Sequence, residues 1–287
     1  MEKHNTTTVL LLGFPDLYTV RILFFLLIFI TYCVTIYGNF MVILLVSTSK
    51  NLHSPMYFFL TQLTTSDMMT TSAIVPNMLN VILKNGSTMS LTGCIMQFVC
   101  FSYPESTECL LLTVMSYDRY LAICKPLNYH SIINSMVCLK SIILCWLISF
   151  IACYIELQSI FQLSFYLSCS DTFRVRLYVT SVSVAVVVVP FVIIVISYAC
   201  IIRAILKMRS INQKKKSFST CGSHLAVVSI FYGTLFVTYL APGNGRSTIL
   251  HKILSLMYCI VTPLLNPVIY CLRNKDIKIA LRKFMQH

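Results

Sequence analysis

The amino-acid sequence predicts an all-α membrane protein, a seven-transmembrane helix bundle that ends in a short amphipathic helix. Three observations predict this fold class: the composition, the long apolar segments without charge, and the distribution of lysine and arginine. Of the 287 residues, 57% are hydrophobic and 11% are charged, and the mean hydropathy is +0.80. Soluble globular domains carry about 25% charged residues. Lipid must therefore replace water as the solvent for much of this chain.

Several segments are long enough to cross a bilayer. Residues 22–49, 177–202 and 253–272 contain no aspartate, glutamate, lysine or arginine, and a crossing helix needs about 20 apolar residues. We expect a single seven-transmembrane domain over residues 1–287, with residues 1–20 as an outer tail. The seven expected spans are residues 21–47, 56–83, 93–124, 137–158, 177–206, 218–241 and 249–271.

Lysine and arginine are unevenly divided between the two sides of these spans. With the N-terminus outside, the inner side carries fifteen of them and the outer side carries seven. Because positive residues favour the cytoplasmic side, we expect multi-pass insertion into a membrane with the N-terminus outside. The net charge of +13 then indicates contact with inner-leaflet lipid. It does not indicate nucleic-acid binding, even at the run Lys214–Lys216.

The inner C-terminal segment, residues 274–287, contains an expected amphipathic helix at about residues 274–285. Its apolar residues recur at helical intervals and its basic residues fill the other face. The apolar set is Ile277, Ala280, Leu281 and Phe284, and the basic set is Lys275, Lys278, Arg282 and Lys283. Such a helix lies in the membrane interface and does not cross the bilayer.

A few polar side chains fall inside the expected spans. A charge at the centre of a membrane helix costs about 2.5–3.5 kcal/mol on insertion scales, so such groups face the bundle interior and are candidates for function. They are Asn39, Asp67, Glu105, Glu108 and Asn266. For Asn39 the simpler interpretation is hydrogen bonding between helices. For Asp67 and Glu108 we favour a polar cluster filled by water or an ion.

Two features suggest moving parts. Pro263 and Pro267 lie inside the last span, where each removes a backbone donor and favours a kink. Asn266 and Pro267, with Tyr270 one turn later, therefore form a candidate hinge. Arg119 ends the third span beside Asp118 and Tyr120. It is either an exposed interfacial residue or a switch that changes its partner between two conformations.

Longer motifs surround these residues in a fixed order. The longest is MSYDRYLAICKPL at residues 115–127. The others are GN at 38–39, PMYFFL at 55–60, SY at 197–198, SFSTCGSHL at 217–225, FYG at 231–233 and PLLNPVIY at 263–270. Together they cover nearly the whole chain. In these motifs the sequence resembles the vertebrate odorant receptors, a branch of the rhodopsin-like G-protein-coupled receptors.

The resemblance implies that the chain binds small organic odorants and activates a stimulatory heterotrimeric G protein, which raises cAMP. It assigns the switch to Asp118, Arg119 and Tyr120, the activation hinge to Asn266, Pro267 and Tyr270, and a central polar cluster to Asn39, Asp67 and Glu108. It places the odorant site in the outer half of the bundle, at Phe101, Ser102, Glu105, Cys109, Tyr232, Thr238 and Tyr239. It also implies a glycan on Asn5 and a location in the plasma membrane.

The chain departs from this family in two places. The expected outer loop at about residues 157–176 is short, and Cys169 is its only cysteine. By the resemblance, Cys94 pairs with Cys169 or stays free, and a receptor without the usual long loop could be a remnant that does not signal. The second departure is Glu105. A buried carboxylate needs a partner or a proton, which suggests a cationic ligand such as an amine, or a protonated Glu105 hydrogen-bonded within the bundle.

Other functional classes fit less well. Small transporters commonly have broken helices in repeated halves of the chain, and the sequence contains no such repeat. It also contains no nucleotide-binding loop, no metal-ligand spacing and no nucleophile elbow, which are the motifs that would indicate common enzyme chemistries. We therefore expect no enzyme activity, no cofactor and no metal site.

Overall fold

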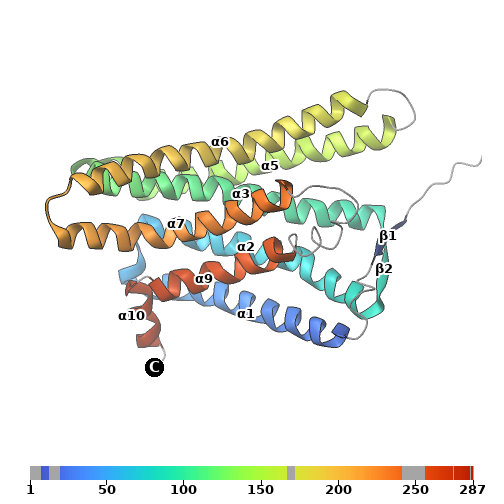
Figure 1. The fold of residues 1–287 in the computed structure, drawn as a ribbon, viewed down its shortest axis with the longest axis horizontal. Coiled ribbons are helices and arrows are strands. Elements are labelled where there is room, and N and C mark those ends of the chain that lie inside the picture. The colour runs from blue at the N-terminus through green and yellow to red at the C-terminus, as the bar shows by residue number, and fades with distance from the viewer. Residues whose placement is uncertain are drawn as a thin grey trace, which may run out of the picture.

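The computed structural model describes residues 8–12, 20–166, 172–240, 256–273, 275–284 and 286. Long helices lie side by side (Figure 1) and form the expected seven-helix bundle. They are α1 (Arg21–Thr48), α2 (Pro55–Lys84), α3 (Leu91–Cys124), α5 (Ser135–Tyr166), α6 (Thr172–Lys207), α7 (Ile211–Leu240) and a seventh helix. The described part of this seventh helix begins as a π-helical turn, η4 (Met257–Val261), and continues as α9 (Thr262–Arg273).

The relatively polar helix α3 lies at the centre of the bundle. Among the described residues, three helices are long and apolar enough to cross a membrane by themselves: α1, the Ser135–Ser159 part of α5 and the Val184–Lys207 part of α6. The more polar α3 packs against α2, α5, α6 and α7. Its polar side chains can therefore face other helices, where partners are available, while the apolar helices face lipid.

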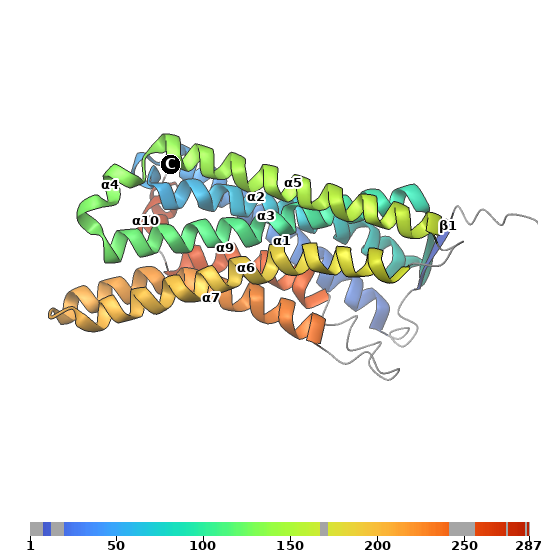
Figure 2. The same cartoon turned by 90° about the horizontal axis from the view of Figure 1, so that it is seen from above.

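Apolar side chains form the outer surface of the bundle as well as its core. On α1, Leu23, Leu27 and Ile30 are 68%, 60% and 59% exposed, whereas Val42 and Leu45 are buried. In water such a surface would aggregate, but in a bilayer it contacts acyl chains. In both views α10 (Lys275–Phe284) lies at one end of the bundle and β1 lies at the other (Figures 1 and 2), and Figure 2 shows α4 (Tyr129–Ile132) at the same end as α10.

The amphipathic C-terminal helix is confirmed as α10, which lies across the direction of the neighbouring α9 (Figure 1). Ile277 and Ala280 are buried against the bundle, while Ile279 and Arg282 are exposed. The Tyr57 hydroxyl of α2 donates a 3.0 Å hydrogen bond to Asp276 Oδ2 in the first turn of α10. This bond and the buried apolar face hold α10 at the inner end of α2.

A two-stranded sheet at the outer end was not predicted. Strand β1 (Thr8–Leu12) pairs antiparallel with β2 (Gly86–Ser90), with Thr8 opposite Ser90 and Leu12 opposite Gly86. Asn85 ends α2 with a φ of 54° and Gly86 follows with a φ of 130°. Asparagine and glycine tolerate these positive values, so the chain can turn sharply from helix into strand.

Three helix boundaries differ from the expectation. The loop expected at residues 157–176 is wrong over most of its length, because α5 continues to Tyr166 and α6 begins at Thr172. Helix α7 begins at Ile211, seven residues before the expected start, so that Lys214–Lys216 are helical. Hydropathy finds the part of a helix that lies in lipid and cannot detect helical extensions into water, which explains all three differences.

Candidate functional site

Pro267 and Asn39 together form the contact between the hinge and α1. Pro267 has no N–H, so the carbonyl of Pro263, four residues earlier, lacks its usual helix donor. The Asn39 side-chain amide fills this place with a 3.0 Å hydrogen bond to the Pro263 oxygen and a second one to the Thr35 oxygen. Gly38 allows the close approach, because a Cβ added there would lie 3.3 Å from Pro267 Cγ.

Asp67 of α2 and Asn266 of α9 form the centre of the polar cluster. The Asn266 amide donates to both carboxylate oxygens of Asp67, at 3.0 and 2.9 Å, and both residues are 1% exposed or less. Glu108 of α3 is also buried and lies close enough to Asp67 for an electrostatic interaction. The predicted cluster is thus divided: Asn39 binds the Pro263 carbonyl, and Asp67, Asn266 and Glu108 lie together.

Two buried oxygens of this cluster, Glu108 Oε1 and Asn266 Oδ1, lack a hydrogen-bond partner among the described residues. The same holds for Asn39 Oδ1 on α1, outside the cluster. A buried oxygen without a partner is costly, and oxygen atoms are the groups that water and hard cations require. The cluster therefore has the donor chemistry for water or a small cation.

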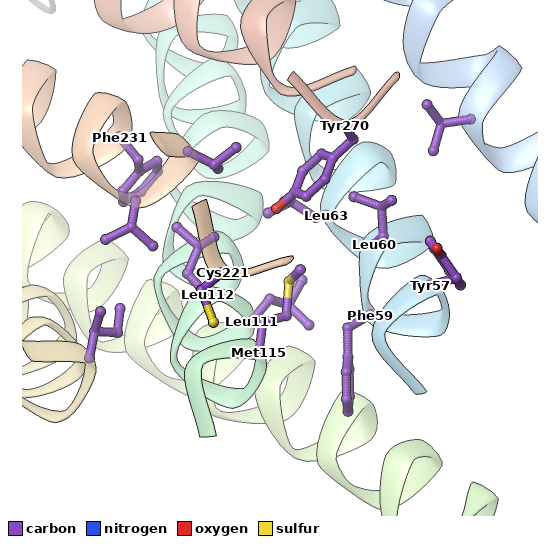
Figure 3. Close-up of a cluster of buried hydrophobic side chains, with 14 of the residues drawn as sticks. Tyr57, Phe59, Leu60, Leu63, Leu111, Leu112, Met115, Cys221, Phe231 and Tyr270 are labelled. Atoms are coloured by element: carbon purple, nitrogen blue, oxygen red, sulfur yellow. The ribbon is translucent and has the colours of Figure 1, made fainter. Parts of the chain in front are cut away.

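An apolar layer separates this cluster from the inner face. On α3, Leu111, Leu112 and Met115 lie between Glu108 and the Asp118–Arg119 pair, and all three are buried. Figure 3 shows them in one cluster of buried side chains with Leu63 of α2 and Tyr270 of α9. The Tyr270 hydroxyl is buried without a hydrogen-bond partner among the described residues. Tyr270 therefore lies inside this apolar layer, one turn beyond Asn266 of the predicted hinge.

In the predicted switch, Asp118 accepts hydrogen bonds from two neighbouring side chains at the inner end of α3. Arg119 donates to Asp118 Oδ2 from Nε at 3.1 Å and from Nη2 at 2.6 Å, and the Tyr129 hydroxyl donates to Asp118 Oδ1 at 2.7 Å. Burial and the adjacent Asp118 raise the pKa of Tyr129, which keeps this hydroxyl protonated. Tyr120, the third predicted residue, is half-buried and stacks on Tyr117.

Sequence reasoning missed Tyr129, which lies in α4, ten residues beyond Arg119. No helical periodicity joins two residues on opposite sides of a turn, so the sequence alone gave no signal for this contact. A second inner contact joins two of the quoted motifs. The Tyr198 hydroxyl of α6 lies 2.7 Å from His224 Nδ1 of α7, and both residues are buried. This contact couples the inner halves of the two helices.

The predicted odorant residues of α3 do not all face the same neighbour. The Ser102 hydroxyl lies 3.2 Å from the Cys153 sulfur of α5, so it faces the fourth helix of the bundle. Glu105 faces the seventh helix, where the Tyr258 hydroxyl of η4 donates to its Oε1 at 2.6 Å. Cys109 is buried and interacts with Tyr232 of α7, and Phe101 is half-buried against the core.

Aromatic rings fill the space beside Glu105 and Cys109. The ring of Phe231 lies 5.9 Å from that of Tyr258 and 5.2 Å from that of Tyr232. Tyr232 in turn packs against Phe191 of α6 at 4.9 Å. The side chains of the other two predicted α7 residues, Thr238 and Tyr239, lie outside the described part of the structure. Tyr258 was not predicted, since nothing in the sequence shows that a π-helical turn directs it towards α3.

Other predictions fall partly outside the described residues. Cys94 is half-buried and has no disulfide partner among the described residues. Its expected partner Cys169 is not described, so whether Cys94 pairs with Cys169 or stays free remains a prediction. Asn5 is likewise outside the described residues. A cavity of about 660 Å³ does lie at the inner ends of α1, α2 and α5, lined by residues such as His53, Phe58 and Gln62. None of the predicted odorant residues lines it.

Comparisons with known proteins agree with the helix arrangement and with the motifs. The family described as olfactory receptor matches residues 27–287. Human olfactory receptor 2W1 is 40% identical over 310 aligned positions, which include 100% of this chain and 96% of that protein. Human olfactory receptor 11A1 is 40% identical and rat olfactory receptor 1468 is 38% identical, each with at least 95% of its length aligned. The chain therefore belongs to the olfactory receptor family.

Proposed function

We propose that this chain binds small organic odorants within the outer half of its helix bundle and activates a stimulatory heterotrimeric G protein. One observation carries the proposal. Glu105, in the expected odorant site, accepts a hydrogen bond from Tyr258. Tyr258 lies in the π-helical turn that leads directly into α9, which carries the hinge residues Asn266 and Pro267. A ligand that changes the Glu105–Tyr258 contact therefore acts on the start of the hinge.

The route from the hinge to the inner face follows described contacts. Pro267 packs on α1 and Asn266 binds Asp67, so a shift of α9 displaces both. Tyr270 lies one turn further inward, within the apolar layer above Arg119. The apolar layer would adopt two arrangements, and the ligand would favour the one to which it binds with higher affinity. This preference would couple odorant binding to the release of Arg119 from Asp118. Water or a small cation at Asp67 and Glu108 would favour the arrangement that holds the cluster together.

The inner end of the bundle carries the positive charge expected of a cytoplasmic surface that binds a G protein. α7 begins with the helical run Lys214–Lys216 and has no acid in its inner turns, so Arg119 finds its partner in Asp118 on its own helix. Basic helix ends favour the cytoplasmic side of a membrane. We therefore infer a plasma-membrane receptor with the N-terminus outside, and an inner surface at Arg119 and the inner ends of α6 and α7 that binds the G protein.

A cAMP assay in transfected cells tests the proposal. The receptor, quantified at the surface by an antibody to an N-terminal tag, is screened against diverse odorants, and Arg119→Ala is compared at equal surface expression. We expect at least one odorant to raise cAMP in the parent protein and Arg119→Ala to abolish the response. An unchanged response in Arg119→Ala would contradict the assigned switch.

A second candidate function follows from the connection between α5 and α6. The alignment with human olfactory receptor 2W1 spans 310 positions whereas this chain has 287 residues, so about 23 positions of that relative have no counterpart here. Only residues 167–171 separate the described ends of α5 and α6. A remnant that reaches the cell surface without signalling would give normal antibody staining and no cAMP response to any odorant.

A further inference from the structure

Glu105 has acidic neighbours and forms no ion pair with a described lysine or arginine. Glu156 of α5 and Glu108 of α3 are both close enough to Glu105 to interact with it electrostatically. The helical stretches 91–118, 141–166, 177–202, 217–240 and 256–272 contain no lysine or arginine. A carboxylate in such surroundings needs a cation or a proton.

The hydrogen bond from Tyr258 leaves much of this need unmet. Tyr258 donates one neutral O–H to Oε1 of Glu105, whereas a carboxylate can accept several hydrogen bonds through its two oxygens. Glu105 is also incompletely buried, unlike Glu108 one turn further inward. The part of Glu105 that is not buried is where a small molecule would contact it.

An independent observation places a second polar atom in the same region. The Tyr232 hydroxyl is buried, with 2% of the residue exposed, and has no hydrogen-bond partner among the described residues. It interacts with the Cys109 thiol, which itself interacts electrostatically with Glu105. A hydroxyl oxygen can accept an N–H hydrogen bond, so Tyr232 can bind the same kind of donor as Glu105.

The rings around these two oxygens suit a cation with an apolar body. Phe231 lies between Tyr258 and Tyr232, with ring centres 5.9 and 5.2 Å away. The face of an aromatic ring attracts an ammonium group within about 6 Å, and its apolar surface binds the hydrocarbon part. A neutral ligand would gain from the rings but not from the carboxylate.

We propose that the outer half of the bundle selects organic amines, bound at Glu105 as ammonium ions that donate hydrogen bonds to its carboxylate while their hydrocarbon part packs on Tyr232, Phe231 and Tyr258. This inference rests on the proposed function, because it names the ligand class of the same site.

The experiment measures ligand binding and signalling separately. Full-length receptor purified in detergent is heated with benzylamine, isoamylamine or cyclohexylamine, and with the alcohol of the same carbon skeleton, and the apparent Tm is recorded. We expect at least one amine, but not its alcohol, to raise Tm. Glu105→Gln keeps an acceptor for Tyr258 and should weaken amine binding about tenfold to a hundredfold, the usual contribution of a charge-assisted hydrogen bond.

Two further variants separate charge from folding. Glu105→Asp keeps the carboxylate and should retain amine binding better than Glu105→Gln. Cys100→Ser alters an exposed position on α3 and should leave both Tm and amine binding unchanged. Equal binding of amines to the parent protein and to Glu105→Gln, or equal stabilisation by amines and alcohols, would overturn the proposal.

The cAMP assay on the same variants distinguishes this inference from the proposed function. If amines raise Tm through Glu105 but no odorant raises cAMP, the amine site stands and the signalling function fails. If neutral odorants raise cAMP equally in the parent protein and in Glu105→Gln, and amines do not bind, signalling stands and the amine site is wrong.

Discussion

The contact between Asn39 and the Pro263 carbonyl predicts an energetic coupling between Asn39 and Pro267. Asn39→Leu keeps the side-chain volume similar but removes the donor to this carbonyl, which is 3.0 Å away. A buried acceptor without a partner costs about 1–3 kcal/mol in soluble proteins. Hydrogen bonds between membrane helices average about 0.6 kcal/mol, with a maximum of about 1.7. We therefore expect Asn39→Leu to lower the free energy of unfolding by about 1 kcal/mol.

Pro267→Ala should remove most of this cost. Alanine at position 267 supplies a backbone N–H in reach of the Pro263 carbonyl, so the helix can satisfy that oxygen without Asn39. Asn39→Leu should then cost less than half as much in the Pro267→Ala background as in the parent protein. The difference between the two costs is the coupling free energy of the pair.

Equilibrium unfolding in mixed micelles, by titration with sodium dodecyl sulfate and circular dichroism of the helices, measures the four proteins of this cycle. Thr31→Val is the matched control. Thr31 also donates to a carbonyl of α1, the Leu27 oxygen at 2.7 Å, but at an exposed position and within its own helix. If Asn39→Leu costs the same in both backgrounds to within about 0.3 kcal/mol, the reasoning is refuted.

Three other predictions concern single contacts. In a thermal unfolding assay, Gly38→Leu should destabilise the bundle by about 1–3 kcal/mol, because the added side chain overpacks against the hinge. Gly233→Ala should not destabilise it, because a Cβ added at Gly233 has no atom within 4 Å. Tyr129→Phe should raise ligand-independent cAMP by roughly twofold to tenfold. The raised pKa of Tyr129 predicts that its bond to Asp118 persists at neutral pH and is lost only above the ordinary tyrosine pKa of about 10; a change in basal signalling between pH 6 and 8 that Tyr129→Phe abolishes would contradict this. Tyr57→Phe should speed hydrogen exchange of α10, and an unchanged rate would exclude the bond as its anchor.

The arrangement of the bundle could be predicted because lipid imposes simple rules on sequence. Long segments without charge must be helices, since no other single segment satisfies its own backbone in lipid. The fifteen to seven distribution of positive residues predicts the orientation, with the N-terminus outside. The inward direction of Asp67 and Asn266 follows from the cost of exposing them to acyl chains, and the structure places them in direct contact.

The partners of individual side chains could not be predicted in the same way. Asn39 was expected to join helices, but its acceptor depends on which carbonyl Pro267 leaves free and on the rotation of α9 about its axis. The η4 turn changes that rotation and brings Tyr258 to Glu105. The strands β1 and β2 are separated by more than seventy residues, and their pairing has no local signature in the sequence.

The short connection between α5 and α6 has a kinetic consequence for the proposed odorant site. Only residues 167–171 separate the described ends of the two helices, and about 23 aligned positions of human olfactory receptor 2W1 have no counterpart in this chain. A binding site with fewer residues over its entrance exchanges its occupant with the surroundings faster. Such a receptor would respond and recover quickly, because rapid dissociation shortens the residence time of the odorant. For the same reason it would respond only at high odorant concentrations.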